Sequence, residues 1–272
     1  MLQTSHPWAG FHAAARCVSG GPIYITDYLN QSDTRLIGQM TALTTHDKTI
    51  ILRPDRVGKA IDVYNAYDAR SLLKIGAYHT KTQSGILAVF NVTHETISEF
   101  LSLAAFPGAK KDIVVGSFKT GQFTDTLSAE SGGSIHTQLE PSQWDIFSAY
   151  SVSEFTVKSK KLGIAMLGLI GKMTGSCAVS SCKMYIEDSG RLRIWTSLKA
   201  LGTLGLWISD LDSREIGDSF FVLIYGKPIP TECVKKSATF GQVLEIDVEK
   251  AWKEGGHKPG WSSEVNVEIF VG

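Results

Sequence analysis

The sequence has no excess of charge of either sign, few cysteines and no long apolar run. Lysine plus arginine number 27 and aspartate plus glutamate also number 27, so no overall field favours nucleic acid or an anionic membrane as a partner. The longest apolar run, residues 162–170, is far shorter than the roughly 20 residues that span a bilayer. The N-terminal residues lack the basic and apolar regions of a secretory signal. We therefore expect a cytoplasmic protein with no nucleic-acid or membrane partner.

The cysteines are scattered and form no Cys-x-x-Cys pair, at positions Cys17, Cys177, Cys182 and Cys233. This spacing matches neither a disulfide framework nor a structural zinc site. It indicates free thiols in a reducing compartment. We expect no metal and no other cofactor.

Two common catalytic or nucleotide-binding motifs are also missing. No Gly-x-Ser-x-Gly elbow of a serine hydrolase occurs. The glycine-rich stretch from Gly163 to Gly175 is similar to a phosphate-binding loop, but Met166 replaces a required glycine and Met173 replaces the required serine or threonine. The stretch is therefore interpreted as a strand that enters a glycine turn.

The first 27 residues carry the most information. Apolar residues at helical spacing predict a helix from about Trp8 to Val18, which ends at the Gly-Gly-Pro sequence of residues 20–22. Ile23–Ile25 then predicts a short buried strand, and Asp27 follows its C-terminal end. In a (β/α)8 barrel a carboxylate at this end of a strand faces the mouth of the active site.

The next segment predicts a second helix. Ser32 or Asp33 is a candidate N-cap, and apolar residues from Leu36 to Leu43 form one face. A helix that follows a strand is the unit repeated in a barrel. The extended stretch 49–59 contains a proline and a glycine, and we place a domain boundary at residue 58.

From about Ser71 onward, short apolar runs alternate with turn signals, which predicts an antiparallel β-sandwich. Glu249–Trp252 could begin a short helix. The predicted strands are 72–78, 85–91, 112–118, 147–152, 162–170, 178–186, 191–195, 205–208, 220–225, 242–247 and 264–271.

Several residues could carry chemistry, but each has a simpler interpretation. His6 and His12 are six apart and do not share a helical face, so a metal-binding pair is not expected. Asp210 and Asp212 resemble part of a calcium loop but lack its other oxygen ligands and its turn glycine, and a plain turn is expected. Five tryptophans could stack on sugars, although tryptophans of a β-sandwich usually belong to its core or rim: Trp144, Trp195, Trp207, Trp252 and Trp261.

Asp27 is the candidate substrate-binding residue, because its position at a strand end gives its carboxylate a reason to accept hydrogen bonds from sugar hydroxyls. The alternative is that it caps the next helix or bonds the adjacent loop. Glycoside chemistry normally needs two carboxylates that flank the scissile bond. The sequence offers one such barrel carboxylate, so no catalytic residue is assigned.

The N-terminal segment resembles the last part of the catalytic barrel of glycoside hydrolase family 36, in the group of raffinose synthases, seed imbibition proteins and alkaline α-galactosidases. Further segments resemble the C-terminal β-domain of that group. The resemblance rests on Met1–Gln3, His6-Pro7, His12 with Ala14–Arg16, Gly21 with Ile23–Ile25, Asp27, Ser71–Ile75, Gly85–Asn91, Leu167–Leu169, Ser197–Gly202 and Glu264–Val267. The sequence departs from the group at Tyr28–Asn30, where a proline-glycine turn is usual.

The resemblance implies a retaining mechanism, either hydrolysis of α-galactosides or galactosyl transfer, on sugars such as galactinol, sucrose, raffinose and melibiose. Members of the group carry both catalytic aspartates before the segment that Met1 matches. We therefore expect this chain to be the C-terminal portion of such a protein, without catalysis of its own. His12 and Arg16 are expected to support the packing of helix on strand.

The expected fold is mainly β, with the C-terminal end of a (β/α)8 barrel over residues 1–58 and an antiparallel β-sandwich over residues 59–272. Two other functions stay open. The chain could be a non-catalytic module that binds a sugar or a partner through its β-sandwich, or a truncated, inactive remnant.

Overall fold

The computed structural model describes residues 1–62, 70–109, 111–239 and 241–272. The chain is mainly β, as predicted, and forms two compact units that are each assembled from separate segments. Unit 1 comprises residues 1–41, 51–151 and 171–174, and unit 2 comprises residues 42–50, 152–170 and 175–272. Among the described residues, no helix has the length and apolarity needed to cross a membrane. The expected boundary at residue 58 stays a prediction.

Unit 1 begins with a parallel bridge between Leu2 and Ile25 that encloses helix α1 (Ala9–Ser19). The Leu2 N–H donates to the Tyr24 carbonyl at 2.6 Å, and the Thr26 N–H donates to the Leu2 carbonyl at 2.9 Å. The helix lies where the sequence predicted it and ends at Gly20, whose φ of 70° is left-handed. Parallel pairing across a helix is the connectivity of a βαβ unit.

The prediction of a buried strand at Ile23–Ile25 is wrong. The structure has a single bridge there, and the side chains of Tyr24 and Ile25 are 63% and 44% exposed. An apolar run predicts burial, but the single bridge to Leu2 covers only one edge of this segment and leaves both of its faces uncovered. Among the described residues, no second strand pairs with this segment.

Helix α2 (Thr34–Met40) confirms the second predicted helix, although it is shorter than expected. Its N-cap is Asp33, whose side chain accepts a hydrogen bond from the Leu36 N–H at 2.9 Å. The helix ends at Met40 because the chain turns extended at Thr41, the first residue of β1 (Thr41–Leu43). Strand β1 pairs with β2 (Thr49–Ile51).

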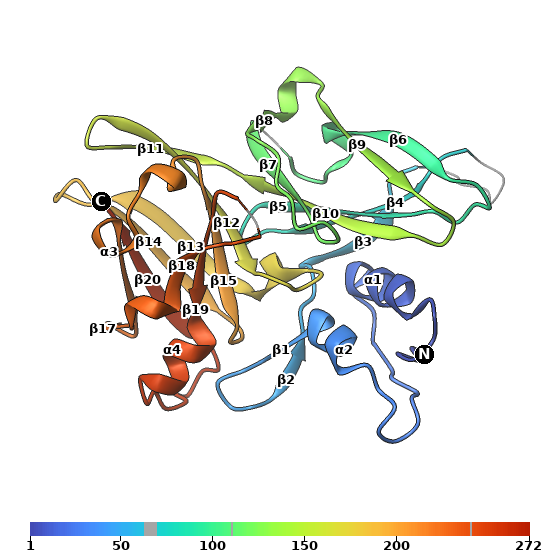
Figure 1. Ribbon diagram of the computed structural model, residues 1–272, viewed down its shortest axis with the longest axis horizontal. Coiled ribbons are helices and arrows are strands. Elements are labelled where there is room, and N and C mark those ends of the chain that lie inside the picture. The colour runs from blue at the N-terminus through green and yellow to red at the C-terminus, as the bar shows by residue number, and fades with distance from the viewer. Residues whose placement is uncertain (63–69, 110, 240) are drawn as a thin grey trace. The chain divides into compact units, whose positions relative to one another are not determined.

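A six-stranded sheet is the centre of unit 1 (Figure 1). Strand β10 pairs antiparallel with both β5 and β7, and every residue of β5 is buried. Such a strand needs a cover on both faces of the sheet. The strand order is β3 (Arg56–Ala60), β4 (Leu73–His79), β5 (Ser84–Phe90), β10 (Trp144–Ser151), β7 (Asp112–Ser117) and β8 (Leu127–Ser128).

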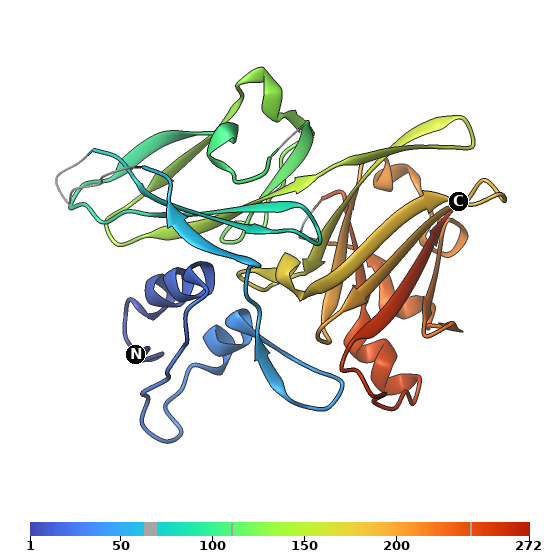
Figure 2. The same ribbon diagram turned by 180° about the vertical axis from the view of Figure 1, so that it is seen from behind.

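Helix α1 covers one face of this sheet, and Figure 2 shows it beside β3 from behind. The rings of Phe11 and Phe90 lie 4.9 Å apart. The approach is closest at Gly58, where a β-carbon would lie 2.7 Å from the Val18 carbonyl oxygen. The alanine-rich face of the helix permits this contact, with Ala13, Ala14 and Cys17 fully buried.

The opposite face packs against a two-stranded sheet of β6 (Ile97–Ser102) and β9 (Ser134–Leu139). Alternate residues of the two sheets share one core, in which Leu87 and Phe147 of the large sheet meet Leu101 and Leu139 of the small one. Neither β6 nor β9 was predicted, because their apolar residues are too few and too interrupted by polar ones to form a run.

Unit 2 contains two five-stranded antiparallel sheets that form its layers in Figures 1 and 2. The first has the order β11 (Ser153–Val157), β12 (Lys160–Leu169), β15 (Thr203–Ile208), β19 (Val243–Asp247) and β18 (Val234–Lys236). The second has the order β13 (Val179–Ile186), β14 (Leu192–Leu198), β20 (Val265–Val271), β16 (Phe220–Ile224) and β17 (Lys227–Pro228).

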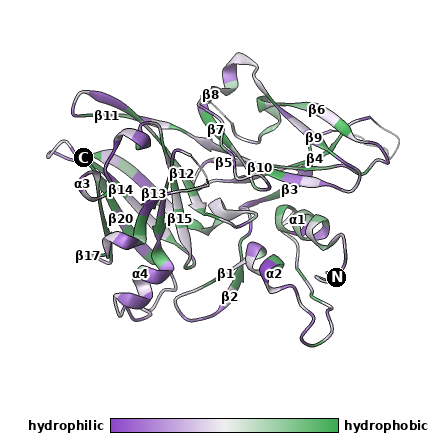
Figure 3. Ribbon diagram, in the orientation of Figure 1, coloured by the Kyte–Doolittle hydropathy of each residue, from purple (hydrophilic) through white to green (hydrophobic). Residues whose placement is uncertain are grey.

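The predicted alternation in the last strand is confirmed. Val265, Val267 and Ile269 of β20 are fully buried, and the residues between them are half-buried. Figure 3 shows β20 as predominantly hydrophobic, whereas β11 is hydrophilic over much of its length. The two remaining helices of the described chain are α3 (Ile216–Ser219) and α4 (Val248–Glu254), of which the second confirms the predicted helix. The other predicted strands are present with ends shifted by a few residues.

A leucine-to-alanine pair tests the two-sided core of unit 1. Leu87→Ala removes a side chain with no exposed surface, and we expect it to lower the free energy of unfolding by about 2–5 kcal/mol. Leu29→Ala changes a side chain that is 90% exposed and should alter it by less than about 0.5 kcal/mol. Urea denaturation followed by circular dichroism measures both, and equal effects would contradict the assigned core.

Candidate functional site

The candidate site lies where the two bridged segments of the N-terminus end. Thr4 follows Leu2 by two residues, and Asp27 follows Ile25 by two residues, so both leave the parallel bridge on the same side. That side corresponds to the C-terminal ends of the paired segments, which is the end of a barrel strand that carries active-site residues. The role expected for Asp27 at the end of a barrel strand stays a prediction.

Both carboxylate oxygens of Asp27 accept hydrogen bonds from Thr4. The Thr4 N–H donates to Oδ1 at 2.6 Å, and the Thr4 hydroxyl donates to Oδ2 at 2.5 Å. The same hydroxyl accepts a hydrogen bond from the Asp33 N–H at 2.6 Å. Asp33 in turn caps α2. Asp27, Thr4 and Asp33 thus tie the two bridged segments and the second helix together.

These contacts determine the charge state of Asp27. The Thr4 hydroxyl lowers the pKa of the carboxyl group more than any other contact, because its hydrogen bond stabilises the ionised form. A general acid of glycoside chemistry needs a raised pKa. Asp27 is half-buried and ionised, and it suits hydrogen-bond acceptance rather than proton donation.

The two histidines of the N-terminal segment differ from the expectation in one respect. His6 and His12 have ring centroids 6.4 Å apart, although their spacing does not fit one helical face. Helical spacing does not apply to this pair, because α1 begins at Ala9 and leaves His6 outside it. His12 is exposed and Arg16 is half-buried, so their expected packing role stays a prediction.

The tryptophans divide into core and surface residues. Trp144, Trp207 and Trp252 are buried, Trp195 is half-buried, and Trp261 is fully exposed. The interpretation as core residues is therefore confirmed for the three buried rings. Trp261 alone of the five presents an open ring face.

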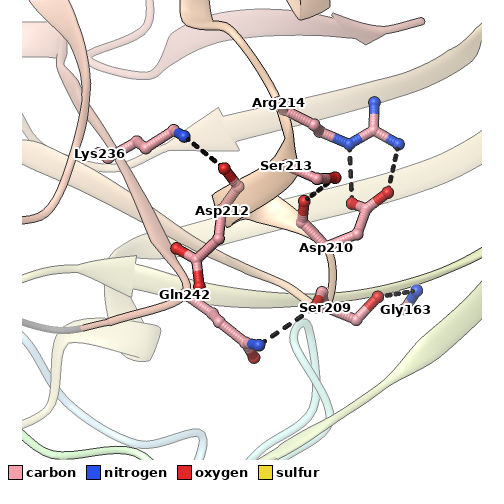
Figure 4. A network of polar contacts seen from close by, with 8 residues as sticks. All are labelled: Gly163, Ser209, Asp210, Asp212, Ser213, Arg214, Lys236 and Gln242. Carbon is pink, nitrogen blue, oxygen red and sulfur yellow. Dashed lines mark hydrogen bonds and ion pairs between the residues drawn. The ribbon is translucent and has the colours of Figure 1, made fainter.

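Asp210 and Asp212 belong to a turn rather than a calcium loop (Figure 4). Both carboxylate oxygens of Asp210 accept hydrogen bonds from Arg214, from Nε at 2.7 Å and from Nη2 at 2.9 Å. Such a bidentate pair uses the oxygens that a cation would need. Within the described part of the chain, no three or more His, Cys, Asp or Glu side chains gather closely enough to hold a metal ion.

The glycine-rich stretch also has a structural role. A β-carbon on Gly168 would lie 2.3 Å from the Gly175 carbonyl oxygen, and one on Gly175 would lie 1.9 Å from the Leu169 carbonyl oxygen. Strand β12 therefore ends in a turn whose backbones are too close for any side chain. This confirms the interpretation of the stretch as a strand entering a glycine turn.

No disulfide joins the cysteines of the described chain, as predicted from their spacing. Burial raises the pKa of both Cys17 and Cys182 to about 12, because an apolar environment disfavours the thiolate. These thiols are therefore poor nucleophiles at neutral pH.

Asp145 is a feature that the sequence reasoning missed. It lies in β10 with its side chain buried, and it lines a cleft of about 510 Å³. The predicted strand began at residue 147 and so omitted it. The available signal was a carboxylate between the apolar residues Trp144 and Ile146, where a solvated charge is not expected.

The pKa of Asp27 tests the contact with Thr4. Thr4→Val removes the hydroxyl, so the pKa of Asp27 should rise toward the usual value of about 3.9. Because folding lowers this pKa, the contact stabilises the protein above the unfolded pKa and is lost as the pH falls through the folded value. Thr4→Ser keeps the hydroxyl and should keep the pKa low. NMR titration of the carboxyl carbon measures both variants, and an unchanged pKa in Thr4→Val would refute the assignment.

The glycine turn gives a second test. Gly175→Ala places a methyl group against the Leu169 backbone and should lower the free energy of unfolding by about 1–3 kcal/mol. The control is Gly217→Ala in α3, where a β-carbon meets nothing within 4 Å. That change should be neutral or stabilising by up to about 1 kcal/mol. Thermal or urea unfolding compares them, and a neutral Gly175→Ala would contradict the close packing.

The chain is similar to known proteins in sequence. Residues 1–102 match the family model of raffinose synthase or seed imbibition protein Sip1. A probable galactinol–sucrose galactosyltransferase 5 of Arabidopsis thaliana is 23% identical over 248 residues, which are 75% of this chain and 30% of the relative. The galactinol–sucrose galactosyltransferase of Pisum sativum is 24% identical over 77% of this chain and 28% of its own length.

A shorter match is closer in sequence. The galactinol–sucrose galactosyltransferase of Oryza sativa subsp. japonica is 37% identical over 95 residues, which are 34% of this chain and 11% of the relative. The chain thus spans about 30% or less of these relatives.

Among solved structures, a putative α-N-acetylgalactosaminidase from Bacillus halodurans C-125 aligns with a TM-score of 0.38 and 12% identity, over 53% of this chain and 30% of that one. The sequence matches together extend over most of the chain and support its resemblance to the raffinose synthase group.

Proposed function

We propose that the chain takes part in α-galactoside metabolism. Its N-terminal segment completes the sugar pocket of a (β/α)8 barrel, and the β-domain follows that segment in the sequence. The observation that carries this proposal is the parallel Leu2–Ile25 bridge across α1, with Thr4 and Asp27 immediately beyond it. A βαβ step of a barrel has this parallel pairing across a helix and carries its active-site carboxylates on this side, which supports the proposal.

Asp27 is the substrate-contacting residue of this proposal. An ionised carboxylate has about four lone-pair sites, and Thr4 occupies two of them with its N–H and hydroxyl. The Ser32 side chain and the Ser5 N–H also lower the pKa of Asp27, so a sugar hydroxyl would bind this carboxylate by sharing or replacing these contacts. The lowered pKa supports acceptance over acid catalysis, so the nucleophile and the acid/base of the retaining mechanism are assigned to other residues of the barrel.

The sugars proposed are galactinol, sucrose, raffinose and melibiose. The support is the names of the relatives, which are galactinol–sucrose galactosyltransferases. The proposed reaction of the whole barrel is hydrolysis of these sugars or transfer of their galactosyl group. The four free cysteines suit a cytoplasmic location, because that compartment keeps thiols reduced.

Two measurements on the purified chain test the proposal. We expect no turnover of a chromogenic α-galactoside, or of galactinol with sucrose, because the chain is assigned no catalytic pair. Calorimetry should detect galactinol binding that Asp27→Asn weakens about 10- to 100-fold, the range for losing a hydrogen bond to a charged group.

The matched control is Asp188→Asn, which changes an exposed aspartate in the turn between β13 and β14. It should bind galactinol as the unmodified chain does. If the chain turns over substrate and Asp27→Asn abolishes that turnover, the assignment of Asp27 to binding is overturned. Galactinol binding that Asp27→Asn leaves unchanged would overturn the proposed site itself.

A further inference from the structure

A cleft in unit 1 lies apart from Asp27, between the two sheets that share the core. It is lined by residues of β7 and β10 of the six-stranded sheet, of the small-sheet strand β9 and of the loop that follows β7. Figure 1 shows β7, β9 and β10 within unit 1. The cleft has a volume of about 510 Å³, within the range of small-molecule sites.

The floor of the cleft is apolar and partly aromatic. Val115, Phe147 and Leu139 line it and belong to the core of unit 1. Phe123 folds back over Gly116, where a β-carbon would lie 2.5 Å from the ring. Apolar surface of this kind suits the C–H faces of a sugar ring.

A buried carboxylate holds the loop that follows β7 in place. Asp145 is 5% exposed, and its Oδ2 accepts a hydrogen bond from the Ser117 hydroxyl at 2.5 Å. Its Oδ1 accepts from the backbone N–H groups of Lys119 at 3.0 Å and of Ile146 at 2.7 Å. Burial raises the pKa of Asp145, and these hydrogen bonds oppose that rise. The contacts hold the loop in place before any ligand binds.

Strand β9 contributes polar groups along its edge. The lining includes every residue from Ile135 to Leu139, so the cleft follows the strand and not one of its faces alone. Among the described strands, β9 pairs with β6, and its other edge carries backbone N–H and C=O groups that no ladder uses. Thr137 adds a hydroxyl, and Gln122 and Gln143 add amides at the rim.

The charges of the lining balance. Its cation is Lys119, whose ammonium lies 4.4 Å from the centroid of the Trp144 ring, and its anion is Asp145. A site for an anionic ligand would need excess cations, and a site for an apolar ligand would not need amides and a hydroxyl. The lining matches a neutral ligand that has both apolar faces and hydroxyl edges.

We propose that this cleft is an accessory sugar-binding site, separate from Asp27, that takes one or two neutral sugar rings. The choice of an α-galactoside among neutral sugars rests on the proposed function. The neutral, hydroxyl-rich character of the ligand rests on the cleft alone. Thr137 and Gln122 hydrogen-bond the sugar hydroxyls, and the Phe123 ring packs against a face of the sugar ring.

Calorimetry of the whole chain with raffinose and galactose tests the proposal. The double variant Thr137→Val with Gln122→Ala removes a hydroxyl and an amide while keeping the strand and the loop, and it should weaken binding about tenfold. The matched controls are Thr156→Val in β11 and Gln39→Ala in α2, which lie outside the cleft and should not change binding. Thermal unfolding verifies that every variant folds.

Each outcome separates this site from the one at Asp27. If the double variant weakens sugar binding and Asp27→Asn leaves it unchanged, the cleft is supported, whether or not the proposed function holds. Binding that Asp27→Asn alone weakens overturns the cleft and leaves the proposed function standing. Absence of sugar binding, or saturable binding of inorganic phosphate or an extended peptide in place of raffinose, also overturns the cleft. Saturating sugar should further slow hydrogen exchange at residues 117–124 and 134–139.

Discussion

The two-sided burial of the six-stranded sheet governs the architecture of unit 1. Strand β5 has no exposed residue, so its sheet can be stable in water only with a cover on each face. Helix α1 provides one cover and the β6–β9 sheet provides the other. The N-terminal helix therefore contributes directly to the β core. Its small residues follow from this role, because the backbones of Val18 and Gly58 meet without space for a larger side chain.

Two buried or half-buried aspartates illustrate how position determines chemistry. Asp27 stands at the end of a bridge, and the Thr4 hydroxyl lowers its pKa. Asp145 stands inside a strand, and burial raises its pKa against three hydrogen bonds. The first keeps its charge and can receive a polar ligand. The second has its oxygens occupied by the protein and organises the cleft around it.

Local signals predicted the elements well and the contacts poorly. The glycine at the end of α1, the Asp33 cap of α2 and the alternation in β20 act within a few residues, and the structure has all three. Strands β6 and β9 were missed because pairing, rather than composition, makes them strands. The contact of Thr4 with Asp27 spans 23 residues and leaves no periodic pattern. Asp145 was overlooked because its partners, Ser117 and Lys119, come from another strand and its loop.

The interleaved course of the chain has a consequence for synthesis on the ribosome. Unit 1 includes residues 171–174, and the Met173 N–H and Lys172 ammonium reach back to the carbonyls of Gln39 and Gly38. Unit 2 includes residues 42–50, and the Leu43 carbonyl accepts a hydrogen bond from the N–H of Leu201, which is synthesised much later. Because translation proceeds from the N-terminus, unit 1 cannot complete these contacts until part of unit 2 has been made. The β1–β2 hairpin is made before its partner and remains without it for about 150 residues of elongation, and a chaperone that shields the hairpin would protect it in that period.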